Sequence, residues 1–381
     1  MSTTITVAWV GIILSVLQQF VGINAVFYYS NTIWEAVGFA QDKAFFTSLI
    51  NTGVNVVFTI VAIALIGVDT IGLVADGVRA IAARYEKSGH RHSAAPFYLR
   101  ACKYYQMGER FRTPKDDIAL AAYKKSIECF HSFAKLTDVK IEIVEVPYAG
   151  GSMPGYFLHA NNAEGKRSPC VVHFDGLDIT KEMLYMRGVP ELPKRGISVL
   201  IMDGPGTGEA IRFRGQVLRH DYEVAGSACI DYLETRKDVD AKKIAVVANS
   251  LGGYYAPRCA SMEPRFAACV AWGAIWDYHA TWKKRVEAAF NAAMSVPGHH
   301  ITWILGVNTV EEALKKLEPY KLDGVVQKMR CPFLITHGAD DEQVPLADAQ
   351  ALYDAAARGK RWTLEMRREL VVLTEPAPLK V

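Results

Sequence analysis

The sequence lacks a large excess of charge of either sign. Its 381 residues include 43 Lys and Arg against 40 Asp and Glu, so the formal net charge is only +3. No basic stripe interleaved with aromatic residues runs along the chain, and both observations argue against nucleic acid as the main partner. A chain of this length has room for one large domain or two ordinary ones. We expect its partner to be a small molecule.

Closely spaced cysteines and clustered metal ligands are also missing. The pairs His90/His92 and His299/His300 have no carboxylate or thiol at ligand spacing. We therefore expect no metal and no cofactor. The cysteines are dispersed, without a C-x-x-C pair, which is typical of reduced core side chains in a reducing compartment. These residues are Cys102, Cys129, Cys170, Cys229, Cys259, Cys269 and Cys331.

Charged residues are scarce in the first 67 positions, where only Glu35, Asp42 and Lys43 occur. Residues 2–34 and 44–68 are uncharged, and each stretch is long enough for a membrane-spanning helix of about 20 residues. A signal peptide fits poorly, because no basic region follows Met1 and no small-residue cleavage site is present. Residues 1–68 are predicted to form an apolar helical hairpin, with the remaining chain in the cytoplasm.

Within this apolar segment, residues 18–30 read Gln-Gln-Phe-Val-Gly-Ile-Asn-Ala-Val-Phe-Tyr-Tyr-Ser. This motif resembles the seventh transmembrane helix of sugar porters in the major facilitator superfamily. The resemblance implies sugar-binding roles for Gln18, Gln19 and Asn24. It covers residues 8–67, which amount to two helices of a fold that needs about twelve. We therefore expect a residual hairpin that acts at most as an anchor, or a product of fusion, rather than a transporter.

Residues 69–139 are predicted to be helical. Apolar positions recur at helical spacing from Ile71 to Ala82, and a second amphipathic stretch follows. The aromatic-rich run at residues 97–105 is predicted to pack against a neighbouring domain, and apolar lids over binding pockets also have this composition. We expect these residues to form a helical cap.

The most informative motif is a strand-like run at residues 243–248 that breaks at Asn-Ser-Leu-Gly-Gly and resumes as a helical stretch. This pattern is typical of a nucleophile elbow, which exposes a serine on a tight turn beside a base and backbone N–H donors. Ala248 replaces the first glycine of G-x-S-x-G. The pattern predicts Ser250 as the nucleophile and Leu251 N–H as an oxyanion donor. The alternative is a serine that only caps a helix.

Strand patterns alternate with helical patterns from residue 140 onward, which predicts an α/β fold with a mostly parallel sheet covered on both faces. Residues 274–328 form an insertion rich in Trp and His, predicted to be a lid. The loop after the third strand contains Gly176 and Leu177, either of which is a candidate for the second oxyanion donor. Strands are predicted at residues 140–146, 155–159, 170–174, 198–202, 243–248, 268–272 and 332–337, and crossover helices at 221–236, 254–262 and 346–357.

Residues 203–210 read Asp-Gly-Pro-Gly-Thr-Gly-Glu-Ala. Their third glycine comes one position too early for a dinucleotide-binding fingerprint, so a structural turn is predicted. With the loop G-L-D-x-T-K-E at 176–182 and the elbow A-N-S-L-G-G-Y-Y-A at 248–256, this motif resembles an α/β-hydrolase family. That family contains dihydroxypseudooxynicotine hydrolase and fungal hydrolases that shorten polyketide pigments. The resemblance covers residues 69–366.

The resemblance implies a Ser-Asp-His triad that cleaves an ester or carbon–carbon bond next to a carbonyl, under a helical N-terminal cap. The implied partner is a small-molecule carbonyl substrate. Ser250 and Asp341 match the nucleophile and the acid of the family in the expected order. Asp340 is an alternative acid, and either aspartate would otherwise cap the helix that starts near Leu346.

The histidine that the family places after one further strand, near residue 370, is missing, and no histidine follows His337. The tail from about residue 367 matches neither the histidine loop of the family nor its closing helix, and we expect it to be truncated or replaced. Other histidines, among which His300 in the lid is the best candidate for a substitute base, are expected to have core or surface roles. Loss of a triad member removes most of the rate, so activity is in question. The alternatives are a membrane-tethered, non-catalytic binding protein and a remnant of a sugar transporter.

Overall fold

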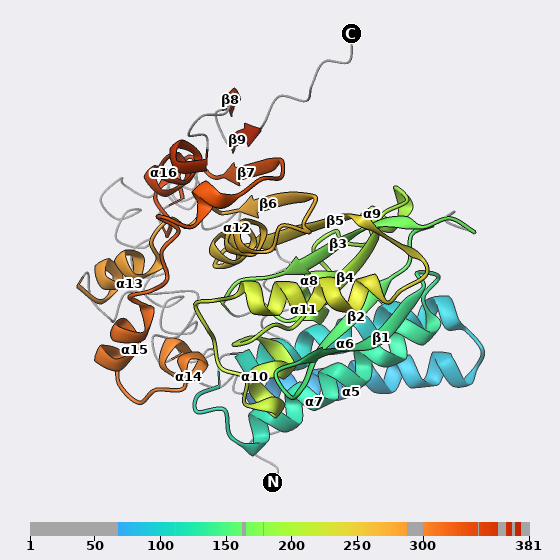
Figure 1. The fold of residues 1–381 in the computed structure, drawn as a ribbon. Coiled ribbons are helices and arrows are strands. Elements are labelled where there is room, and N and C mark those ends of the chain that lie inside the picture. The colour runs from blue at the N-terminus through green and yellow to red at the C-terminus, as the bar shows by residue number, and fades with distance from the viewer. Residues whose placement is uncertain are drawn as a thin grey trace, which may run out of the picture. The chain divides into compact units, whose positions relative to one another are not determined.

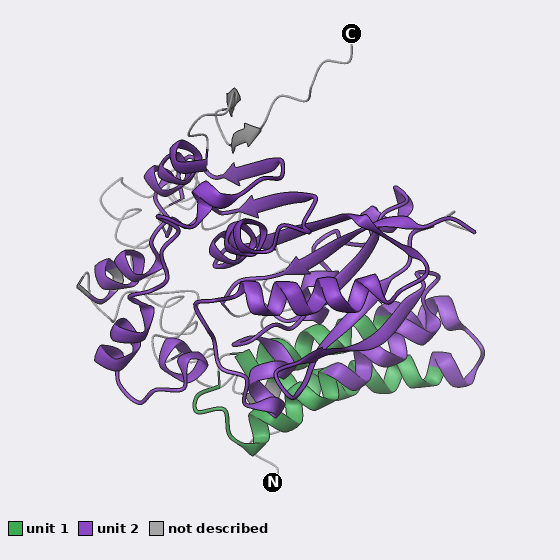
Figure 2. Cartoon of the chain, in the orientation of Figure 1, with its two compact units in different colours: residues 1–84, 97–126 green, residues 85–96, 127–381 purple. Residues whose placement is uncertain are grey.

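The computed structural model describes residues 68–110, 112–161, 165–177, 179–287, 300–341, 343–356, 363–367 and 370–374. The chain divides into two compact units, one of residues 1–84 and 97–126 and the other of residues 85–96 and 127–381 (Figure 2). The predicted apolar hairpin, with Gln18, Gln19 and Asn24, lies outside the described residues. Within the described ranges, no helix combines the length and the apolar character that crossing a membrane requires.

Three helices occupy the stretch for which the sequence predicts a helical cap: α5 (Val68–Lys87), α6 (Arg91–Arg110) and α7 (Asp117–Leu136) (Figure 1). In the first unit, Asp76 of α5 links all three helices. It accepts a hydrogen bond from the hydroxyl of Tyr105 in α6 and lies 2.9 Å from Nζ of Lys125 in α7. Buried side chains such as Ala75 and Tyr123 fill the space between the helices. That these helices act as a cap stays a prediction.

The second unit contains a nine-stranded sheet with the strand order β1-β2-β4-β3-β5-β6-β7-β9-β8. The pairs β3/β4, β3/β5, β5/β6 and β6/β7 are parallel, and the strands at both ends of the sheet pair antiparallel. The predicted mostly parallel sheet is therefore confirmed. The strands are β1 (Ile141–Tyr148), β2 (Gly151–Leu158), β3 (Ser168–Phe174), β4 (Ser198–Met202), β5 (Val239–Asn249), β6 (Ala268–Trp272), β7 (Phe333–His337), β8 (Thr363–Arg367) and β9 (Leu370–Thr374).

The central strands are continuous apolar runs because both faces of a parallel sheet are covered. Val172 of β3 lies in register with Leu200 of β4 and with Val246 of β5, and all three side chains are fully buried. All seven cysteines are buried, as expected for core residues. Because β3, β5, β6 and β7 run parallel, their carboxyl ends meet at one edge of the sheet, and the loops that carry the candidate site emerge there.

Helices connect the strands of this unit, and α12 packs against β5 and β6 while α11 packs against β5. The predicted lid insertion contains α13, α14, α15 and the 3₁₀ helix η1. The bounds are α8 (Lys181–Tyr185), α9 (Glu191–Lys194), α10 (Gly208–Arg214), α11 (Glu223–Glu234), α12 (Gly252–Met262), α13 (Tyr278–Glu287), α14 (His300–Leu305), α15 (Val310–Leu317), η1 (Val326–Lys328) and α16 (Leu346–Ala356).

The end of the sheet departs from a simple parallel continuation. β9 pairs antiparallel with β7, and β8 pairs antiparallel with β9, so β8 lies outermost and runs in the same direction as β7. The carboxyl end of β8, at Arg367, is thus at the edge where the other parallel strands end. The chain returns through β9, which begins at Leu370, and residues 363–374 contain no histidine.

Candidate active site

The serine of the elbow lies between β5, which ends at Asn249, and α12, which begins at Gly252. Ser250 has a φ of +57° and an exposed side chain. A left-handed conformation is unfavourable for a non-glycine residue and persists only where the surrounding structure imposes it. The backbone supplies that constraint: Ser250 N–H donates to Trp272 O at 2.7 Å, and Ser250 O accepts from Gly253 N–H at 2.7 Å.

Glycines make room for this turn on three sides. A Cβ on Gly253 would lie 2.0 Å from Gly273 O, and a Cβ on Gly252 would lie 2.5 Å from the Cβ of Ala248. A Cβ on Gly176 would lie 2.8 Å from both the Cβ of Ser250 and the backbone N of Leu251. The methyl group of Ala248 therefore fits because Gly252, its neighbour in α12, has no side chain.

The loop of residues 175–180 follows β3 and contacts the elbow through Gly176. Asp175 holds the start of this loop, because its Oδ1 accepts the Gly176 N–H at 2.6 Å and its Oδ2 lies 3.3 Å from Nδ2 of Asn249, the residue before the serine. The carboxylate also pairs with Arg187 at 3.2 Å. Of the predicted oxyanion donors, Gly176 N–H thus has an acceptor already.

The two remaining candidate donors are Leu177 and Leu251. Within the described ranges, neither backbone N–H has a hydrogen-bond acceptor. The side chains of Leu177 and Leu251 are both buried. Backbone amides near a nucleophile can stabilise an oxyanion, so Leu177 and Leu251 both stay candidate donors.

Asp341 lies in the loop after β7, at the same edge of the sheet. Its Oδ1 accepts the backbone N–H of Gln343 and of Val344, at 2.8 and 3.0 Å, and its side chain is half-buried. His337 closes this loop, because its Nε2 lies 2.9 Å from Val344 O. With β6 between β5 and β7, and about 4.8 Å between neighbouring strands, the two strand ends are about 10 Å apart. Ser250 and Asp341 therefore follow strands that are separated by one strand of the sheet. Asp340 is exposed.

The buried histidines of the described ranges are held in other roles. His173 is the penultimate residue of β3, and burial lowers the pKa of its imidazole to about 4. His300, at the start of α14, is buried, and its Nε2 lies 3.3 Å from Leu177 O. His300 thus links the predicted lid to the loop beside the elbow. His299 lies outside the described residues. No cluster of three His, Cys, Asp or Glu side chains able to hold a metal occurs in the described ranges.

Trp272 is a feature of the site that the sequence reasoning did not identify. It ends β6, directly beside Asn249 in register, and its side chain is 56% exposed. Beside the serine of the elbow, this exposed indole offers an apolar contact for a substrate. A tryptophan at the carboxyl end of a predicted parallel strand was the available signal.

Family comparisons separate the two parts of the chain. FrsA-like esterases match residues 79–370, and a second family, described as sugar and other transporters, matches residues 1–72. Hydrolase LUC6 of a Fusarium species is 30% identical over 311 residues, covering 72% of this chain and 74% of that protein. The 20-hydroxy-prefusarin hydrolase FUS2 of Gibberella moniliformis is 29% identical over 300 residues, covering 70% of this chain and 71% of that protein.

Solved structures give the same answer for the fold. The 2,6-dihydroxy-pseudo-oxynicotine hydrolase superposes with a TM-score of 0.67 at 27% identity, covering 76% of this chain and 78% of that one. The predicted resemblance to α/β-hydrolases is therefore confirmed, and the match over residues 79–370 spans more than half of the chain. This chain belongs to the FrsA-like esterase family.

Proposed function

We propose that the protein is a serine hydrolase in which Ser250 attacks the carbonyl carbon of an ester or of a ketone-type carbon–carbon bond. The observation that carries this proposal is the left-handed Ser250, at +57° in φ, exposed at the carboxyl edge of a parallel sheet. Strain of this kind concentrates at functional sites, and a serine that merely capped α12 would not need it.

The reaction follows from the groups around the serine. The Ser250 Oγ–carbon bond forms as the carbonyl π electrons move to oxygen, and the serine proton passes to a base. Leu251 N–H and Leu177 N–H stabilise the resulting oxyanion, with Leu177 preferred over Gly176 because the Gly176 amide already donates to Asp175. Collapse breaks the ester C–O bond or the C–C bond. The leaving group takes up a proton, and water hydrolyses the acyl-enzyme.

The absent imidazole limits this chemistry. Asp341 has no histidine after it in the sequence, and the β8–β9 hairpin brings none to the site. Removal of one triad member lowers kcat by about 10⁴ to 10⁶, leaving the contributions of the oxyanion hole and binding. We infer a hydrolase with slow turnover that reacts best with strongly electrophilic carbonyl groups. The resemblance to hydrolases that shorten polyketide pigments favours small carbonyl compounds of the polyketide type, and the exposed Trp272 favours an apolar acyl group.

A fluorophosphonate probe tests the nucleophile. We expect labelling of the wild-type protein and none of Ser250→Ala, with Ser261→Ala as a control because Ser261 is buried in α12. Labelling that persists in Ser250→Ala would refute the assignment. Ligand binding without labelling or turnover would favour the non-catalytic binding protein, which retains the pocket but not the chemistry.

The N-terminal segment carries a separate proposal. Its uncharged runs at 2–34 and 44–68, and the transporter family that matches residues 1–72, support a hairpin that anchors the hydrolase to a membrane. A role in sugar transport through Gln18, Gln19 and Asn24 would need the remaining helices of that fold.

A further inference from the structure

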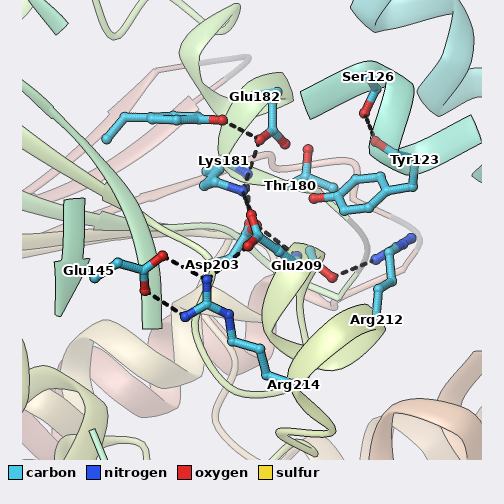
Figure 3. Close-up of polar contacts among 12 residues, drawn as sticks. Tyr123, Ser126, Glu145, Thr180, Lys181, Glu182, Asp203, Glu209, Arg212 and Arg214 are labelled. Atoms are coloured by element: carbon cyan, nitrogen blue, oxygen red, sulfur yellow. Dashed lines mark hydrogen bonds and ion pairs between the residues drawn. The ribbon is translucent and has the colours of Figure 1, made fainter. Parts of the chain in front are cut away.

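A buried lysine lies at the end of the loop that contacts the nucleophile (Figure 3). The Lys181 side chain is 1% exposed, and its ammonium group is surrounded by three carboxylates. Nζ lies 2.9 Å from Oε1 of Glu182, 2.9 Å from Oδ2 of Asp203 and 3.1 Å from Oε2 of Glu209. We propose that Lys181 and Asp203 are positioning residues that hold the 175–180 loop against Ser250. This proposal deepens the proposed hydrolase function and rests on it.

Asp203 connects two segments of backbone to the lysine. Its Oδ1 accepts the Lys181 backbone N–H at 2.7 Å, and its Oδ2 accepts the Glu209 backbone N–H at 2.8 Å. A Cβ on Gly208 would lie 2.0 Å from the Asp203 carboxylate, so the turn after β4 needs glycine there. The motif D-G-P-G-x-G-E thus receives a physical explanation: its first and last residues are both ligands of one ammonium group.

The network continues from the buried ammonium group to the surface. Glu209 Oε1 accepts from Arg214 at 2.8 Å, and Arg214 also pairs with Glu145 (Figure 3). Tyr156 donates to Oε1 of Glu182 at 2.7 Å. Burial alone would raise the pKa of Glu182, but the Lys181 ammonium and these hydrogen bonds lower it to about 2. Every carboxylate around the lysine therefore has further donors that fix its direction.

The position of this network explains why it would serve the site and not stability alone. The 175–180 loop is held at its start by Asp175, which contacts Asn249, and at its end by the Lys181 backbone N–H on Asp203. Between these points, Gly176 packs on Ser250, and Leu177 supplies the proposed oxyanion donor. Apolar side chains of similar volume would stabilise such a core at least as well as buried ions. Directional hydrogen bonds, in contrast, fix the backbone of a loop that has little regular structure.

The test compares Lys181→Met and Asp203→Asn with the control Arg236→Gln. Arg236 is also largely buried and binds two carboxylates, Glu142 and Asp238, at 2.8 Å each, but it precedes β5 at the opposite edge of the sheet. Two quantities are measured: hydrogen–deuterium exchange of the amides at residues 176–180, and the second-order rate constant of fluorophosphonate labelling at Ser250. Lys181→Arg serves as the conservative variant.

In both test variants we expect faster exchange in the loop, and labelling slower by about 10-fold to 100-fold, approaching the loss of an oxyanion donor. With ester substrates the loss should appear in kcat, with KM within about twofold, because the oxyanion forms only in the transition state. Lys181→Arg should recover part of the rate. Arg236→Gln should change neither quantity, although it lowers the melting temperature.

Unchanged loop exchange and unchanged labelling in a folded Lys181→Met protein would overturn the proposal. If Lys181→Met does not fold, the same two readings in the isosteric Asp203→Asn variant decide the matter. A wild-type protein that is never labelled would contradict the proposed hydrolase function. In that case, loop exchange that accelerates in Asp203→Asn but not in Arg236→Gln would still uphold the role of the network in holding the loop.

Discussion

The elbow predicts that Ser250→Gly is more stable than Ser250→Ala. At a φ of +57°, any side chain with a Cβ approaches the following carbonyl oxygen, at a cost of about 1–2 kcal/mol, whereas glycine avoids this contact. Glycine also loses about 0.4–1 kcal/mol more backbone entropy on folding. The expected net difference is therefore about 1 kcal/mol in favour of Ser250→Gly, or about 2–4 °C in melting temperature. The serine hydroxyl is exposed, so Ser250→Ala should match the wild-type protein.

Equilibrium urea unfolding of the three proteins measures this difference. The slope of free energy against urea should be the same in all three, because the exposed surface on unfolding does not change. The same substitution at Ser227, an ordinary helical position in α11, should have the opposite sign, with Ser227→Gly less stable than Ser227→Ala by about 1 kcal/mol. If Ser250→Gly proved no more stable than Ser250→Ala, the serine would not be strained, and the central argument for a nucleophile would fail.

Four further outcomes are expected. Imidazole at millimolar concentration should accelerate ester hydrolysis by the wild-type protein but not by Ser250→Ala, since it supplies the missing base; equal acceleration in both would show that the base is not limiting. The pKa of His173, lowered to about 4 by burial, means that the unfolded state binds this proton first, so stability falls as pH drops from about 6.5 toward 4, by about 3 kcal/mol in total. His173→Gln should weaken the dependence of the unfolding free energy on pH between pH 6.5 and 5. An unchanged pH dependence would contradict the burial argument. Gly176→Ala should slow labelling by about 100-fold because its Cβ would meet Ser250 at 2.8 Å, while Gly77→Ala, in open space on α5, should not; equal rates would exclude close loop contact. After a carbonate wash, the full chain should stay with the membrane pellet, and release into the supernatant would reject the anchor.

The local pattern of the sequence was sufficient for the fold class. Each predicted strand overlaps a strand of the sheet, and the crossover helices predicted at 221–236, 254–262 and 346–357 correspond to α11, α12 and α16. The physical reason is that buried parallel strands are continuous apolar runs, whereas the helices that connect them have apolar residues at helical spacing. The pair of strands β8 and β9 differs from the single further strand that the resemblance implies at this place, since the pairing of β9 between β7 and β8 depends on which edge of the sheet is free.

For the candidate site too, the sequence determined one part and the tertiary structure decided the rest. The sequence by itself determined the elbow at residues 249–253, because a strand, a small-residue turn and a helix follow one another along the chain, and it also determined that residues 342–381 contain no histidine. Only the tertiary structure decided that Gly176 N–H donates to Asp175, which leaves Leu177 as the proposed donor of this loop, and that Lys181 meets Asp203 in the core. These contacts join residues on different strands and loops. Their existence depends on the order of strands in the sheet, which brings the loops to one edge, and not on any local period of the chain.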